Sequence, residues 1–173
     1  MPRRPLVLIG PMGSGKSRTG KRLARRLGLT FTDTDSVFER ENGAITAFFN
    51  EHGQDAFRRL EREIVRAAIE AGGVIATGGG AVLDAETQKD LERCAVAYLS
   101  VSAEAVEARI RGERKRPLLL DGGLDRWIAI ADERRPIYER LGTIHVDTSH
   151  RPMEAVADEL AAWYRSRYGG DAS

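Results

Sequence analysis

Residues 10–17 read Gly-Pro-Met-Gly-Ser-Gly-Lys-Ser and match the phosphate-binding loop pattern G-x4-G-K-S. The apolar run Leu6–Ile9 before them predicts a strand, and Ser17–Leu27 after them predicts a helix. Glycines here let the backbone curl, so that successive N–H groups and the helix N-terminus can face phosphate oxygens. A chance glycine-rich turn is the alternative, but the full pattern in this context argues against it and favours a nucleoside triphosphate site.

Within this loop we expect Lys16 to reach the β- and γ-phosphates and the Ser17 hydroxyl to be a ligand of Mg²⁺. The residues predicted to bind ATP here are Gly13, Ser14, Gly15, Lys16, Ser17 and the adjacent Arg18. The loop specifies the nucleotide but not the reaction.

Two patterns that accompany other phosphate-binding loops are missing. A GTPase would need Asn-Lys-x-Asp to read its base, but neither Asn42 nor Asn50 precedes a lysine. A motor or transporter ATPase would carry a Walker-B strand that ends in an acidic residue, whereas Val74–Thr77 runs into Gly78-Gly79-Gly80. Small-molecule kinases are the large class that remains.

Short apolar runs alternate with longer amphipathic segments along the chain. Strands are predicted at Leu6–Ile9, Thr30–Thr32, Val74–Thr77, Ala95–Val101 and Thr143–Asp147. Helices are predicted at Ser17–Leu27, Ser36–Asn42, Ala44–His52, Gln54–Ala71, Ala85–Arg93, Ala103–Arg111, Leu124–Leu141 (with a kink or break at Pro136 left open) and Pro152–Tyr168. This alternation predicts a three-layer α/β fold, with helices on both faces of a parallel sheet and ligands beyond the carboxyl ends of its strands.

Length and composition bound the remaining possibilities. The 173 residues, 42% of them apolar, suit one domain with a single core, and residues 112–123, which are bracketed by glycines and lack periodicity, form a candidate lid. A net charge of +1 gives no pull toward nucleic acid or a membrane surface, and one cysteine excludes an internal disulfide. We therefore expect a cytoplasmic protein without a membrane span.

Two carboxylates follow the predicted second strand, in the sequence Asp33-Thr34-Asp35. Residues two apart in an extended chain point to the same side, so both carboxylates can face the phosphate-binding loop. One suits water-mediated binding of Mg²⁺, and the other can take the proton of a substrate hydroxyl. Asp35 could instead be only the N-cap of the helix Ser36–Asn42, but beside a phosphate-binding loop the functional role is favoured.

Three arginines stand out by position: Arg58 at a helix start, Arg116 in the candidate lid, and Arg134 before Arg135-Pro136. Guanidinium groups bind carboxylates and phosphates through two hydrogen bonds at once. A site that grips an acid while transferring a phosphate needs such groups, although sequence spacing does not make these three converge.

In their order, these motifs resemble the shikimate kinase family from about Leu6 to Pro152. The resemblance rests on the phosphate-binding loop, Asp-Thr-Asp at 33–35, Ala-Phe-Phe at 47–49 with Gly53, Phe-Arg-Arg-Leu-Glu at 57–61, Gly-Gly-Gly at 78–80, Arg-Pro-Leu-Leu at 116–119, Arg134 with Pro136 and Tyr138, and Val-Asp-Thr at 146–148. It implies a nucleoside-monophosphate-kinase-like P-loop fold with a five-stranded parallel sheet, a substrate-binding helical segment at about 35–62 and a mobile lid. It also implies a monomer that phosphorylates the 3-hydroxyl of shikimate with ATP, in chorismate and aromatic amino acid biosynthesis.

The resemblance further implies individual roles. Shikimate would contact Asp35, Phe49, Phe57, Arg58, Glu61, Gly79, Gly80 and Arg134. Arg58 and Arg134 would clamp its carboxylate, and Asp35 would be the base. Lys16 and Arg116 would neutralise the transferred group. Ser17 and Asp33 would hold Mg²⁺, Asp33 through water. Arg109 and Pro152 would sandwich adenine, while Arg18 stands where the family often has threonine.

Two other functions remain open from the residues. A related kinase could act on gluconate or a nucleoside monophosphate, although a nucleotide acceptor would want a pocket for a flat base rather than a carboxylate clamp. A non-catalytic ATP-binding regulator would have lost catalytic groups, yet Lys16, Asp33, Asp35 and Arg116 are all present.

Overall fold

The computed structural model describes residues 3–112 and 123–169. Its sheet consists of β1 (Leu6–Ile9), β2 (Phe31–Asp33), β3 (Val74–Ala76), β4 (Ala95–Ser100) and β5 (Ile144–Asp147). The strands lie in the order β2-β3-β1-β4-β5, and every neighbouring pair is parallel. The predicted five-stranded parallel sheet is therefore confirmed.

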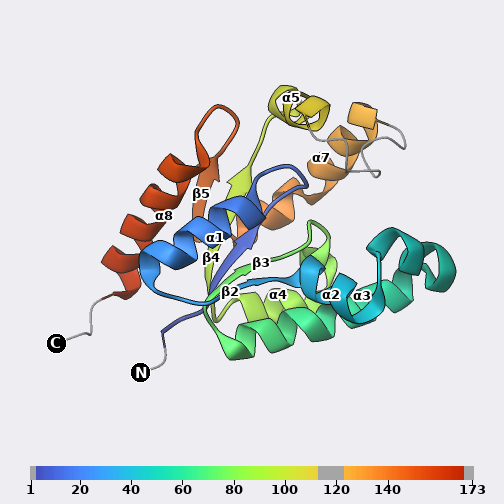
Figure 1. Ribbon diagram of the computed structural model, residues 1–173, viewed down its shortest axis with the longest axis horizontal. Helices are drawn as coiled ribbons and strands as arrows, with labels where there is room; N and C mark the ends of the chain where they lie inside the picture. Colours follow the sequence, from blue (N-terminus) through green and yellow to red (C-terminus); the bar gives the residue numbers. More distant parts are fainter. Residues whose placement is uncertain (1–2, 113–122, 170–173) are drawn as a thin grey trace.

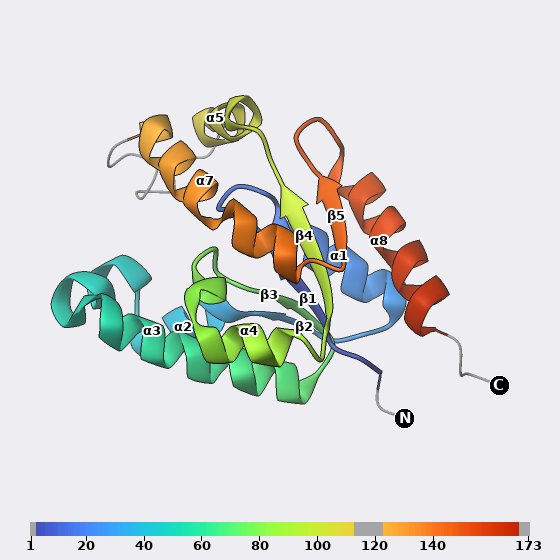
Figure 2. The same cartoon turned by 180° about the vertical axis from the view of Figure 1, so that it is seen from behind.

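Helices follow the strands, as the alternation predicts (Figures 1 and 2). They are α1 (Lys16–Leu27), α2 (Thr34–Asn42), α3 (Ile45–Ala71), α4 (Ala85–Leu91), α5 (Ala103–Gly112), α7 (Gly123–Leu141) and α8 (Met153–Tyr168), with a short 3-10 helix, η1 (Ala81–Leu83). The helix α3 spans two predicted helices, and Gly53 interrupts it with non-helical dihedrals (φ 84°, ψ 173°). Pro136 lies inside α7 without ending it.

Alternate side chains of the strands enter two separate cores. Leu6 and Leu8 of β1 pack with α1 and α8 on one face of the sheet. Val7 and Ile9 pack with α3, η1, α4 and α7 on the other face. Because successive residues of a strand point to opposite faces, the continuous apolar run of β1 requires a cover on both sides. This gives the three layers that the sequence predicts.

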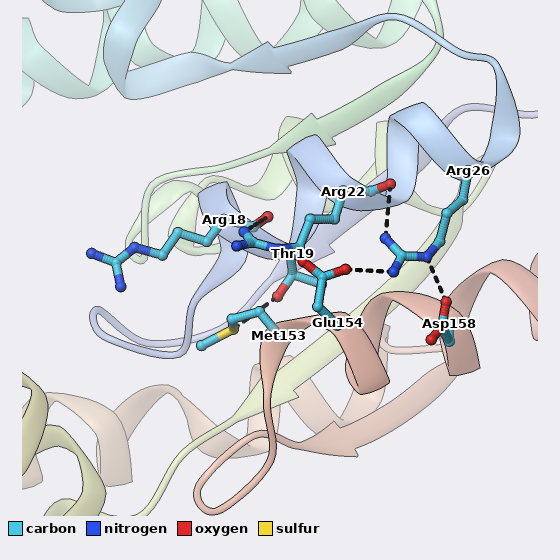
Figure 3. Close-up of polar contacts among 7 residues, drawn as sticks. All are labelled: Arg18, Thr19, Arg22, Arg26, Met153, Glu154 and Asp158. Atoms are coloured by element: carbon cyan, nitrogen blue, oxygen red, sulfur yellow. Dashed lines mark hydrogen bonds and ion pairs between the residues drawn. The ribbon is translucent and has the colours of Figure 1, made fainter.

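Ion pairs mark the seam between α1 and α8 (Figure 3). Arg22 and Arg26 both bind Glu154, and Arg26 also binds Asp158, each at 2.5 Å. The acidic partners are largely exposed, and such pairs contribute little to stability individually. Beneath them, α8 buries Val156, Ala157, Leu160 and Ala161 almost completely, so apolar packing supplies most of the attachment.

The phosphate-binding loop extends from the carboxyl end of the central strand β1. Helix α1 continues onto one face of the sheet, while the chain after the neighbouring strand β3 continues onto the other. Ligands of open parallel sheets bind where connections diverge in this way. In both ribbon views the loop lies next to the first half of α7 (Figures 1 and 2). Within the described residues, no helix is both long and apolar enough to cross a membrane.

Candidate active site

Three glycines shape the loop between β1 and α1. Gly10, Gly13 and Gly15 have φ values of 148°, 84° and 86°, a region that residues with a side chain rarely occupy. A Cβ on Gly10 would also lie 2.2 Å from the carbonyl oxygen of Leu99. Sequence and conformation agree here, because the G-x4-G-K-S pattern places glycine where the backbone curls.

Lys16 lies beneath this curl and is only 9% exposed. Its ammonium group donates to the carbonyl oxygens of Gly10 at 2.7 Å and Pro11 at 3.0 Å. These bonds hold a positive charge at the opening of the loop, where the predicted phosphate contact requires it.

The two acidic residues where β2 ends and α2 begins are arranged differently from the sequence prediction. Asp33, not Asp35, is the N-cap of α2, and its carboxylate accepts from the N–H groups of Asp35 at 3.0 Å and Ser36 at 3.2 Å. The prediction of an extended Asp33–Asp35 segment is therefore wrong, as is the alternative that Asp35 caps the helix. The helix begins at Thr34 because Asp33 satisfies the N–H groups of its first turn.

Asp33 keeps a second contact that fits its predicted metal role. The Ser17 hydroxyl donates a hydrogen bond to the other oxygen of its carboxylate. A hydroxyl and a carboxylate side by side at the phosphate-binding loop are the oxygen ligands that Mg²⁺ prefers. The fold thus brings the predicted pair together, with Ser17 in the first turn of α1 and Asp33 at the end of β2.

Asp35 points from the first turn of α2 toward the end of β3. Its carboxylate lies so close to Gly78 that a Cβ there would be 2.7 Å from Oδ1. Burial raises the pKa of Asp35 to about 6, with further increases from Asp33 and Glu61 and an opposing effect of Lys16. A carboxyl with a pKa near neutrality can exchange a proton with a substrate hydroxyl.

Arg58 and Glu61 form an ion pair on the second half of α3, with 2.7 Å between Nη1 and Oε1. Glu61 is buried, and burial raises its pKa, while Arg58 and then Arg134 oppose the increase. The guanidinium of Arg58 also lies over the ring of Phe57, 5.2 Å from its centre. The Nε of Arg58 is buried without a hydrogen-bond partner among the described residues.

The three glycines after β3 lie between the phosphate-binding loop and the charged side chains of the site. A Cβ on Gly80 would lie 2.3 Å from Nη2 of Arg58, so a side chain there would displace the guanidinium from this position. At Gly79 the nearest atoms, Nη1 of Arg134 and the Gly10 carbonyl oxygen, would both lie 3.5 Å away. Side chains at Gly80 and Gly78 would therefore displace Arg58 and Asp35, whereas Gly79 has room for a Cβ.

Tyr138 is a site residue to which the sequence assigned no function. It is 1% exposed, and its hydroxyl donates to the Gly79 carbonyl at 2.5 Å. Burial raises the pKa of Tyr138 to about 12, so the phenol remains a donor. Because the carbonyl and the following N–H point in opposite directions across a trans peptide, this bond fixes the direction of the Gly80 N–H. The only sequence signal for Tyr138 was its place in the family pattern, two residues after Pro136.

Aromatic side chains form one wall of the site. Phe57 is buried against Phe38 at 5.0 Å between ring centres and against Phe49 at 5.8 Å. Phe49 is 38% exposed, an unusual exposure for so large an apolar side chain. The predicted pocket residues Phe49 and Phe57 therefore lie together on the α2–α3 segment.

The two residues predicted to bind adenine lie beside the phosphate-binding loop, on the side formed by α5 and α8. Arg109 donates to the carbonyls of Gly13 at 2.6 Å and Thr148 at 2.5 Å, so its guanidinium is engaged by backbone. Pro152 is exposed at the N-cap of α8. Arg18 is exposed and extends away from the acidic residues of α8 (Figure 3). Arg116 and nearly all of the predicted lid at 112–123 lie outside the described residues.

The fold and this site define a P-loop enzyme of the small-molecule kinase class. A curled loop with a buried lysine, a hydroxyl–carboxylate pair for a cation, a carboxyl with a raised pKa and two arginines meet at one end of a parallel sheet. Comparison with known proteins identifies the family within that class.

The chain belongs to the shikimate kinase family, whose sequence model matches residues 12–165. It is 45% identical to a shikimate kinase of Thermobifida fusca, over 94% of this chain and 98% of that protein. A shikimate kinase of Xanthomonas euvesicatoria is 40% identical, over 92% and 93% of the two chains.

Solved structures agree with this assignment. A shikimate kinase from Acinetobacter baumannii in complex with shikimate superposes with a TM-score of 0.88 at 30% identity, covering 95% of this chain and 94% of that one. A gluconokinase from Sinorhizobium meliloti has a TM-score of 0.65 at 19% identity, over 96% and 94% of the two chains, which is a likeness of fold alone.

The raised pKa of Asp35 predicts a pH-dependent cost to stability. As the pH rises from the ordinary value of 3.8 toward about 6, the unfolded chain gives up this proton while the folded protein keeps it, so stability falls and the full loss is present above pH 6. Asp35→Asn should therefore be more stable than wild type at pH 7.5, by on the order of 2 kcal/mol, and about equal to it near pH 3.5. Urea unfolding at the two pH values measures the difference.

The exposed Asp55 on α3 provides the control, because Asp55→Asn should change the free energy of unfolding by less than about 0.5 kcal/mol. An Asp35→Asn protein that gains no stability at pH 7.5 would contradict the inference that the buried Asp35 carboxylate destabilises the folded protein.

Proposed function

We propose that this protein transfers the γ-phosphate of ATP to the 3-hydroxyl of shikimate, giving shikimate 3-phosphate and ADP. The observation that carries the proposal is the meeting, in one site, of a phosphate-binding loop, a carboxyl with a pKa of about 6 and the guanidinium groups of Arg58 and Arg134. Membership of the shikimate kinase family supports the same substrate.

The arginines would orient the acid. Arg58 is fixed by Glu61 and packed on Phe57, and its buried Nε is available to an acceptor. Arg134 reaches the same place from α7. Two guanidinium groups from different helices would hold the carboxylate of shikimate through charge-assisted hydrogen bonds, while the Gly80 N–H, directed by Tyr138, would add a backbone donor.

Held in this way, the ring would present a hydroxyl to Asp35. The hydroxyl oxygen would form a bond to the γ-phosphorus as the bond from that phosphorus to the β,γ-bridging oxygen breaks, and the hydroxyl proton would pass to Asp35. The electron pair of the broken bond would leave with ADP. Catalysis of this type depends mainly on position and on neutralisation of charge.

The phosphate-binding loop would supply that neutralisation. Its inward N–H groups and the Lys16 ammonium would bind the phosphates, with Lys16 exchanging a carbonyl contact for a phosphate oxygen. Ser17 and Asp33 would hold Mg²⁺, whose charge offsets that of the phosphates. Arg116 is proposed to act on the transferred group from the segment outside the described residues.

The acceptor is tested by ADP release with ATP·Mg²⁺ and shikimate, gluconate, AMP or no acceptor. We expect ADP formation that depends on shikimate. Turnover with a different acceptor only would keep the assignment of the protein as a kinase but reject the carboxylate clamp. Nucleotide binding without turnover of any acceptor would indicate the regulator alternative instead.

Replacing Arg134 by methionine tests the clamp directly. The substitution keeps much of the apolar stem but removes the guanidinium, so KM for shikimate should rise about 10- to 100-fold with KM for ATP within about threefold. Initial-rate kinetics with each substrate varied in turn measure both constants.

The adjacent Arg135 is a matched control, since it is exposed and paired with Asp132 at 2.6 Å. Arg135→Met should leave both constants within about twofold of wild type. If the two variants affected KM for shikimate equally, the specific role of Arg134 would be rejected.

A further inference from the structure

Five consecutive carbonyl groups of the phosphate-binding loop accept hydrogen bonds from side chains. Lys16 binds the first two, those of Gly10 and Pro11. The next three bonds are from Trp127 Nε1 to Met12 at 2.8 Å, Arg109 Nη1 to Gly13 at 2.6 Å, and Thr148 Oγ1 to Ser14 at 2.9 Å. These three donors come from α7, from α5 and from the chain after β5, so separate parts of the fold hold one short loop.

This arrangement determines where the N–H groups of the loop point. The described peptide bonds are trans, and across a trans peptide the carbonyl and the following N–H point in opposite directions. A carbonyl held outward at Met12 therefore turns the Gly13 N–H inward, and the carbonyl of Ser14 does the same for Gly15. Glycine resists rotation of its peptides less than other residues do, so the loop needs restraints from outside.

Of the three outside donors, Trp127 belongs to an apolar cluster that also contacts the loop. It is 8% exposed and packs in an apolar cluster between α5 and α7, with Ala105, Val106 and Ala131. Met12 packs against the same cluster, and Val106 lies against Gly13, where a Cβ would meet its Cγ2 at 3.3 Å. The indole N–H donates and cannot accept, so its partner has to be an acceptor such as this carbonyl.

We propose that Trp127 is a positioning residue for nucleotide binding: its N–H holds the Met12 carbonyl away from the bound phosphates and so directs the Gly13 N–H toward them. The inference rests on the proposed use of ATP, but not on which acid is phosphorylated. Without the indole donor, the Met12 carbonyl would be able to turn inward and repel phosphate oxygens.

Trp127→Phe tests the inference, because it keeps an aromatic ring in the cluster and removes the donor. The dissociation constant of ADP·Mg²⁺ and the KM for ATP should rise about three- to tenfold, with KM for shikimate unchanged. Thr148→Val, which removes the donor to Ser14, should have an effect of the same kind. Trp163→Phe is the matched control, since Trp163 on α8 packs against the core on the opposite face and should leave all three constants unchanged.

A second measurement does not depend on the folding of the Trp127→Phe variant. The sequence has two tryptophans, so Trp163→Phe leaves a single indole N–H signal in a ¹⁵N-labelled protein. We expect ADP·Mg²⁺ to shift this signal and shikimate alone to leave it in place. An indole signal unmoved by saturating ADP, or a Trp127→Phe protein that binds ADP within twofold of wild type, would overturn the proposal.

The outcomes also separate this inference from the proposed function. A weakened affinity of Trp127→Phe for ADP, in a protein that phosphorylates no shikimate, would support the positioning role and reject the substrate. Wild-type protein that binds no ADP would reject both.

Discussion

The site is organised around the curl of the phosphate-binding loop at the end of β1. Its glycines adopt backbone angles that residues with a side chain rarely occupy, and side chains from three other parts of the chain donate hydrogen bonds to its carbonyls. Every other functional group is placed relative to this loop. A Cβ on Gly79 would lie 3.5 Å from the Gly10 carbonyl oxygen, so the glycines after β3 adjoin the first residue of the loop.

Opposite charges share a small volume beyond the sheet, and their arrangement gives the site its chemistry. The buried Glu61 forms an ion pair with Arg58, and this pair fixes the position of the guanidinium. Burial raises the pKa of the Glu61 carboxyl. Burial raises the pKa of Asp35 to about 6, with further increases from its acidic neighbours Asp33, Glu61 and Glu39 and an opposing effect of Lys16. The same surroundings that make this carboxylate unfavourable for stability make it a competent proton acceptor at neutral pH.

Much of this could be predicted from local sequence. The apolar runs predicted each strand, and the glycine pattern predicted the curl, because both depend on neighbouring residues. The extended geometry proposed for Asp33-Thr34-Asp35 was wrong, since Asp33 caps a helix that already begins at Thr34. The prediction extended the strand geometry to Asp35, two residues beyond its end at Asp33.

Long-range contacts could not be predicted from the residues in the same way. Arg58 and Arg134 lie on helices far apart in sequence, and only the resemblance to a family implied that they act together. Tyr138 had only a place in the family pattern, Trp127 was assigned no role, and both are buried. Their polar ends matter because the fold brings backbone carbonyls of two distant loops to them, and no spacing rule encodes that.

The central claim is that the acid lies between the two arginines with a hydroxyl on Asp35, facing the phosphate-binding loop. A crystal structure with shikimate and an unreactive ATP analogue measures this most directly. The account predicts the shikimate carboxylate within hydrogen-bond distance of Arg58 and Arg134, and one ring hydroxyl within about 3 Å of the Asp35 carboxylate. A carboxylate bound instead at the N–H groups of the phosphate-binding loop, with the ring away from Asp35, would contradict it.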